Sequence, residues 1–122
     1  MSEFKWGILG PGGIARAFAK DIALLDGHRV AAVGSRTLSN AQEFARSFGG
    51  TAYGSYQDLV MDPHIDAIYV ATPHPWHKEN VIAALNAGKP VLCEKPFAVN
   101  AREAQEMVDA AQVNNLALME AM

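Results

Sequence analysis

The chain alternates short apolar runs with segments of helical periodicity, and this alternation limits the folds open to it. Six runs have the character of buried strands, at residues 4–9, 29–33, 51–53, 67–71, 90–93 and 116–119. Helical patterns separate them, at residues 14–25, 39–48, 55–60, 81–85 and 100–111. Such β–α alternation is typical of a parallel sheet with helices on both faces. We therefore predict an α/β fold, a doubly wound parallel sheet of about six strands.

Helix starts are marked by polar residues followed three positions later by a polar or acidic one. This spacing lets a side chain cap the first turn of a helix. Three pairs have it: Ser39 with Gln42, Ser55 with Asp58, and Asn100 with Glu103. Each pair predicts the N-terminus of a helix.

The turn after the first strand is rich in glycine. Gly10, Gly12 and Ala15 match the pattern G-x-G-x-x-(G/A), after a strand and at the start of a helix. Gly10 suits a tight turn, Gly12 admits a pyrophosphate close to the backbone, and Ala15 lets helix and strand pack closely. The helix N-terminus adds N–H groups for an anion, so Gly12, Gly13 and Ile14 are the expected contacts. A glycine turn without function is the alternative, and no Gly-Lys-Ser/Thr sequence follows that would indicate an NTP site.

The residues after the second strand decide between NAD and NADP. NAD sites usually have Asp or Glu here, which accepts from the ribose 2′-OH. This chain has Ser35, Arg36 and Thr37 instead. An arginine can pair with a 2′-phosphate and stack on adenine, and the hydroxyls can donate to the phosphate. We predict NADP, with NAD as the second choice; the alternative is an exposed loop arginine with two cap-type hydroxyls.

Thr72, Pro73 and His77 belong to a loop that follows the fourth strand. Ligands of open α/β sheets bind at this edge, so His77 is either a cofactor-loop residue or a structural one. His74 and His77 are three residues apart, but no acidic partners have ligand spacing and Cys93 is the one cysteine. We therefore predict no metal site.

The fifth strand is followed by Glu94, Lys95 and Pro96. A lysine at this edge of the sheet can hydrogen-bond a ribose, a substrate oxygen or the nicotinamide amide. The alternative is a solvated surface lysine. Because Lys95 stands between a strand end and a proline, the functional interpretation is favoured.

Composition excludes other classes of protein. The 122 residues suffice for one domain, half of them are hydrophobic, and the net charge of −3 comes without a basic run, so no nucleic-acid partner is expected. No stretch reaches the ~18–20 apolar residues that a membrane span needs. The first residues lack the pattern of a secretory signal. One cysteine suits a reducing compartment, so we expect a cytoplasmic protein.

Together, these motifs resemble the glucose–fructose oxidoreductase/inositol dehydrogenase (Gfo/Idh/MocA) family. The similarity covers the whole chain, and its most specific part is the stretch Ala87–Pro96, which reads AGKPVLCEKP. The resemblance implies a two-domain NAD(P)-dependent oxidoreductase with an N-terminal Rossmann domain. It implies that Lys95 lies beside the nicotinamide and contacts substrate, that Thr72, Pro73 and His77 line the cofactor cleft, and that Glu94 and Pro96 belong to the same site. Within the family, the last residues, 118–122, which read LMEAM, are similar to the dimeric dihydrodiol dehydrogenase and sugar dehydrogenase branch.

The sequence ends soon after its sixth strand begins, without a polar tail. We expect residues 1–122 to be the dinucleotide-binding domain of a longer enzyme that acts on a sugar- or polyol-like substrate. The substrate domain would follow, and the fragment alone would be inactive. The strand edge at residues 116–119 makes a homo-oligomer the expectation. Two alternatives are a non-catalytic nucleotide sensor, which would not need Lys95, and a stand-alone interaction domain.

Overall fold

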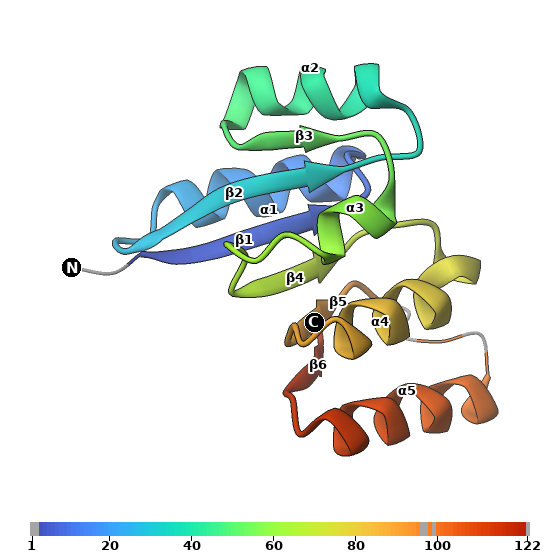
Figure 1. Ribbon diagram of the computed structural model, residues 1–122. Coiled ribbons are helices and arrows are strands. Elements are labelled where there is room, and N and C mark those ends of the chain that lie inside the picture. The colour runs from blue at the N-terminus through green and yellow to red at the C-terminus, as the bar shows by residue number, and fades with distance from the viewer. Residues whose placement is uncertain (1–2, 96–97, 99, 122) are drawn as a thin grey trace.

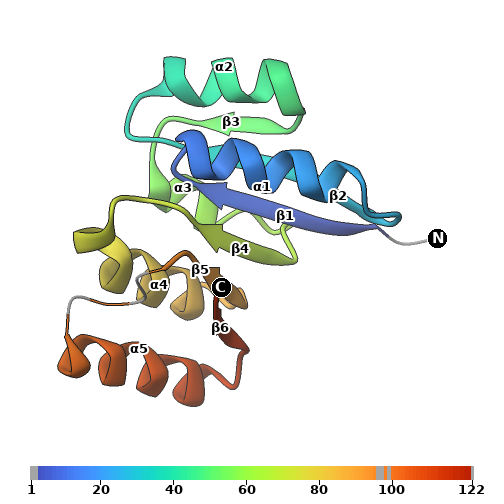
Figure 2. The same ribbon diagram turned by 180° about the vertical axis from the view of Figure 1, so that it is seen from behind.

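The computed structural model describes residues 3–95, 98 and 100–121, which form one six-stranded sheet with helices on both faces (Figures 1 and 2). The strands are β1 (Phe4–Leu9), β2 (His28–Gly34), β3 (Thr51–Tyr53), β4 (Ala67–Val70), β5 (Val91–Cys93) and β6 (Leu118–Glu120). The helices are α1 (Gly13–Ala23), α2 (Leu38–Phe48), α3 (Tyr56–Val60), α4 (His77–Asn86) and α5 (Ala101–Asn114), with a 3-10 turn η1 (His74–Trp76) before α4.

Every strand pairs in parallel with its neighbour, in the order β3-β2-β1-β4-β5-β6. The chain moves outward from β1 to β3, then crosses back to β4 beside β1 and moves outward to β6. This is the strand order of a doubly wound dinucleotide-binding fold. The predicted fold class is confirmed.

Alternating side chains divide the core into two layers. In β1, Ile8 packs with residues of α1 and α2, whereas Leu9 packs on the opposite face with residues of α3, α4 and α5. In β4, Tyr69 belongs to the first layer and Ile68 to the second. The two figures show α1 and α3 on opposite sides of the sheet. All four residues of β4 are buried, on both faces of the sheet, which explains the unbroken apolar sequence of this strand.

Two predicted helix caps are confirmed and one is wrong. The Ser55 Oγ accepts from the Asp58 N–H at 3.1 Å, and the Asn100 Oδ1 accepts from the Glu103 N–H at 2.9 Å. Ser39 does not cap α2, because its N-cap is Thr37. The chain turns earlier than predicted: the Ser35 Oγ accepts from the Thr37 N–H at 3.1 Å. Ser39 therefore lies inside the first turn.

The last strand begins two residues later than predicted. Asn115 ends α5 in the left-handed conformation, with φ 55°. The Leu116 N–H then donates to the Ala111 carbonyl at 3.0 Å. Leu116 therefore still belongs to the C-terminal cap of α5, and pairing with β5 begins at Leu118. None of the helices in the described part of the chain has the length and hydropathy to cross a membrane.

Candidate functional site

A crevice opens where the sheet reverses its order, beyond the carboxyl ends of β1 and β4. Backbone hydrogen bonds fix both loops there: the Gly10 N–H donates to the Gly34 carbonyl at 2.9 Å, and the Ala71 N–H to the Leu9 carbonyl at 2.8 Å. Open α/β sheets bind ligands at this switch point. A cavity of about 320 Å³ lies there, lined by Gly10, Pro11, Gly12, Ser35, Arg36, Thr37, Asn40, Tyr56, Ala71 and Pro73.

The glycine turn after β1 leaves the backbone open at the start of α1. Gly10 has φ +95°, and a Cβ there would lie 3.0 Å from the carbonyl carbon and oxygen of Ala71. At Gly12 and Gly13 a Cβ would meet nothing within 4 Å, so the backbone is open to a ligand. Gly12 is the N-cap of α1, which has no side-chain cap and no acidic residue in its first turn. The first-turn N–H groups are thus available to an anion.

The two glycines of this turn should respond differently to alanine. Gly10→Ala combines positive φ with backbone crowding, so we expect the free energy of unfolding to fall by about 1–3 kcal/mol. Gly12 is extended, with φ −80°, and tolerates a Cβ in the protein alone. Gly12→Ala should keep its stability yet lose about tenfold in dinucleotide affinity, or ~1.4 kcal/mol. Thermal unfolding and cofactor titration of both variants test this; equal losses of stability would contradict it.

The segment after β2 brings an arginine and two hydroxyls to the rim of the cavity. Ser35 is buried and its hydroxyl supports the turn, whereas Arg36 and Thr37 are exposed. The first turn of α2 contains no acidic residue, and Thr37 makes no side-chain cap. The ion pairs among the described residues join other groups, Arg29 with Glu3 and Lys78 with Glu106. The predicted trio therefore lies together, beside an uncapped helix start.

A second cavity, of about 230 Å³, shares Arg36 and Tyr56 with the first. Its other lining residues are Trp76, Glu79 and Asn80. Sequence reasoning missed this wall, together with Asn40. The indole of Trp76 is a signal that could have been used, because it lies just after β4 at the ligand-binding edge and is 47% exposed. Tyr56 has no such signal, because it lies in α3 and its position in the cavity wall depends on how α3 packs.

The loop after β4 is held by buried polar side chains. The Thr72 carbonyl lies 2.8 Å from the Nε2 atom of His77, and the Thr72 hydroxyl accepts from the Asn80 Nδ2 at 2.8 Å. Thr72 and His77 are 3% and 2% exposed. These contacts fix the loop that carries Pro73 into the cavity wall. Direct contact of Thr72 or His77 with a cofactor stays a prediction.

The remaining predicted residues do not line this cavity. Gly13 and Ile14 are exposed at the start of α1. Glu94 follows β5, where its N–H donates to the Val70 carbonyl at 2.9 Å, and Lys95 is exposed next to it. Pro96 lies outside the described residues. The structure thus brings the glycine turn and residues 35–37 together, with Glu94 and Lys95 further along the same edge.

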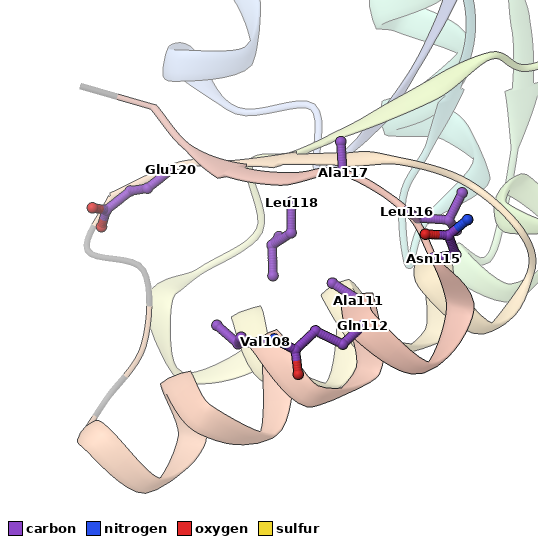
Figure 3. Close-up of a pocket in the computed structure, with 8 residues that line it drawn as sticks. All are labelled: Val108, Ala111, Gln112, Asn115, Leu116, Ala117, Leu118 and Glu120. Carbon is purple, nitrogen blue, oxygen red and sulfur yellow. The ribbon is translucent and has the colours of Figure 1, made fainter.

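A larger cavity lies elsewhere, between α5 and β6 (Figure 3). It measures about 590 Å³ and is lined by Val108, Ala111, Gln112, Asn115, Leu116, Ala117, Leu118 and Glu120. β6 is the edge strand, so this cavity is separated from the β1 turn by β4 and β5. Among the residues that the structure describes, no group of three His, Cys, Asp or Glu side chains could hold a metal ion.

Known proteins resemble this chain closely in sequence. It is 47% identical over 121 residues to trans-1,2-dihydrobenzene-1,2-diol dehydrogenase of Mus musculus, covering 97% of this chain and 36% of that protein. It is 44% identical over 131 residues to D-xylose 1-dehydrogenase (NADP(+)) of Hypocrea jecorina, covering 97% of this chain and 34% of the relative. The chain thus spans about a third of the length of these curated relatives.

Solved structures share the fold of this chain. An NAD-binding oxidoreductase from Klebsiella pneumoniae superposes with a TM-score of 0.92 at 32% identity, over 98% of this chain and 34% of that one. KijD10, a 3-ketoreductase from Actinomadura kijaniata in complex with NADP, gives 0.93 at 32% identity, over 98% and 38%. The family model for the oxidoreductase family with an NAD-binding Rossmann fold matches residues 4–122. This chain therefore belongs to the Gfo/Idh/MocA oxidoreductase family.

Proposed function

We propose that this chain is the NADP-binding domain of an oxidoreductase that transfers hydride between the nicotinamide and a sugar- or polyol-like alcohol or carbonyl. The observation that carries the choice of NADP is the segment after β2. It has no carboxylate for a ribose 2′-OH, and Arg36 stands exposed in the wall of the crevice beside the uncapped start of α2. A guanidinium beside free helix N–H groups suits a phosphate dianion.

The strand order supports the following placement of the parts of the dinucleotide. The pyrophosphate fits the glycine turn after β1, where Gly12 and Gly13 leave the backbone open. The adenosine part then lies on the β2 side, between Arg36 and the rings of Tyr56 and Trp76. The nicotinamide half extends the other way, over the ends of β4 and β5. This direction leads toward Glu94 and Lys95.

Bound NADP supplies a nicotinamide ring that accepts or donates hydride. The role of this domain is to bind NADP and to orient its nicotinamide ring. Lys95 is the candidate catalytic residue, a cation at the nicotinamide end that can hydrogen-bond a substrate oxygen. We further propose that the whole protein has a second domain for substrate, because the chain spans about a third of its relatives. The names of those relatives support a diol or sugar as substrate.

The cofactor preference is the direct test of this proposal. Titration calorimetry of the unmodified protein with NADPH and NADH should give at least several-fold tighter binding of NADPH. The additional affinity for NADPH comes from contacts of its 2′-phosphate with Arg36 and with the hydroxyls of Ser35 and Thr37. Equal affinities for the two cofactors would contradict the preference for NADP. If neither cofactor bound, the proposal of a dinucleotide site would be wrong.

Two further features of the protein belong to the same proposal. We infer that this domain by itself forms a homo-oligomer, since β6 is an edge strand and its Met119 is 65% exposed. We also infer a cytoplasmic location. The sequence has one cysteine, the buried Cys93, and this supports a reducing compartment.

A further inference from the structure

A tyrosine ring lies inside the apolar layer between the sheet and α1. Tyr69, on the central strand β4, is 2% exposed, and its ring stacks on Phe18 of α1 with centroids 3.9 Å apart and planes 9° apart. A phenylalanine would make the same stack. The hydroxyl adds one contact, a hydrogen bond that Tyr69 donates to the Glu94 carboxylate. Packing alone therefore does not account for a tyrosine at this position.

The hydrogen bond joins two strands at the edge where the cofactor is expected. Tyr69 lies opposite Leu92 in the β4–β5 pairing, and Glu94 follows two residues later. The Glu94 N–H is fixed by the Val70 carbonyl at 2.9 Å, so the backbone and the carboxylate of Glu94 are each attached to β4. Lys95 comes next in the chain. These two hydrogen bonds of Glu94 therefore also set the direction in which the chain leaves β5.

The phenol is suited to a permanent donor role. Burial, and then the hydrogen bond and the charge of Glu94, raise the pKa of Tyr69 well above its ordinary value. The hydroxyl therefore keeps its proton at neutral pH, and it donates to one oxygen of a half-buried carboxylate. The other carboxylate oxygen remains an acceptor for hydroxyl or amide groups of a ligand.

We propose that Tyr69 is a positioning residue that holds Glu94, and with it the Glu94–Lys95 segment, toward the nicotinamide half of the bound cofactor. Tyr69 itself touches neither cofactor nor substrate, because its ring is enclosed by the core. The inference rests on the proposed function, since it requires the dinucleotide to cross from the β2 side to the β5 side. It adds a residue of the α1-side layer to the site.

The test compares a whole cofactor with half of one. NADPH and 2′,5′-ADP share the adenosine and 2′-phosphate contacts, but only NADPH reaches β5. We expect Tyr69→Phe to weaken NADPH about tenfold, typical of a lost hydrogen bond to a charged group, and to leave 2′,5′-ADP binding unchanged. Glu94→Gln should act in the same direction. The double variant should bind NADPH no more weakly than Glu94→Gln, because Tyr69 acts through that carboxylate.

Tyr53→Phe is the matched control. Its hydroxyl also donates to a carboxylate, at 2.7 Å to the Asp62 Oδ2, outside the two crevice cavities. It should change the affinity of neither ligand. The inference is overturned if Tyr69→Phe leaves NADPH binding intact, if it weakens both ligands equally, or if the two substitutions add in the double variant. Failure of the unmodified protein to bind 2′,5′-ADP would instead contradict the NADP site itself.

Discussion

Replacing Lys95 with alanine in the complete enzyme is expected to lower kcat about 10²–10³-fold, the usual cost of losing a positioned polar group at the reacting centre. Lys95 is exposed at the end of β5, on the side of the crevice assigned to the nicotinamide. NADPH affinity should change little, because the phosphate and adenosine contacts belong to β1 and β2. Steady-state rates with a sugar or diol substrate, together with NADPH titration, measure the two effects separately.

Lys20→Ala is the control for a general loss of positive charge. Lys20 is an exposed lysine in the last turn of α1, away from the carboxyl edge of the sheet. It should leave kcat unchanged. An unchanged kcat in Lys95→Ala would reduce Lys95 to a solvated surface residue, and a parallel loss of NADPH binding would give it a binding role instead.

The second large effect is expected at Arg36. Arg36→Ala should weaken NADPH about 10–100-fold, since charge-assisted hydrogen bonds contribute about 1.5–3 kcal/mol each. NADH has no 2′-phosphate and should lose far less, so the preference between the cofactors disappears. Titrations of both cofactors at low and moderate salt measure this, and the NADPH advantage of the unmodified protein should shrink as salt rises.

Arg102→Ala serves as the matched substitution for that experiment. Arg102 is an exposed arginine on α5, the helix that packs near the edge strand β6. It removes the same charge without touching the crevice. A loss of NADPH affinity as large in Arg102→Ala as in Arg36→Ala would assign the effect to net charge and not to a phosphate contact.

The fold could be predicted because each strand and helix carries its own local signal. The unbroken apolar run of residues 67–71 indicates a strand buried on both faces, and it occupies the centre of the sheet. Errors fell at element ends, where nearby groups compete. Ser39 has the spacing of a cap, but the hydroxyl of Ser35 turns the chain earlier. Asn115 similarly delays the last strand.

The sequence predicts those residues of the candidate site that are contiguous within a single turn. The glycine turn and residues 35–37 are each contiguous in sequence, and the strand order brings both to one cavity. Tyr56 and Asn80 reach that region from α3 and α4, a placement that depends on tertiary packing. The bond from Tyr69 to Glu94 spans 25 positions of the sequence and follows from strand pairing. No local pattern carries such contacts.

The most direct test of the central claim is to follow backbone amide signals of the ¹⁵N-labelled chain by NMR while NADP⁺ is added. Binding in the crevice between β1 and β4 predicts the largest shifts at Gly10, Gly12 and Gly13, and at Arg36 and Thr37. The amide signals of the residues that line the α5–β6 cavity should not shift. Shifts concentrated in that cavity, or none at millimolar NADP⁺, would contradict the account.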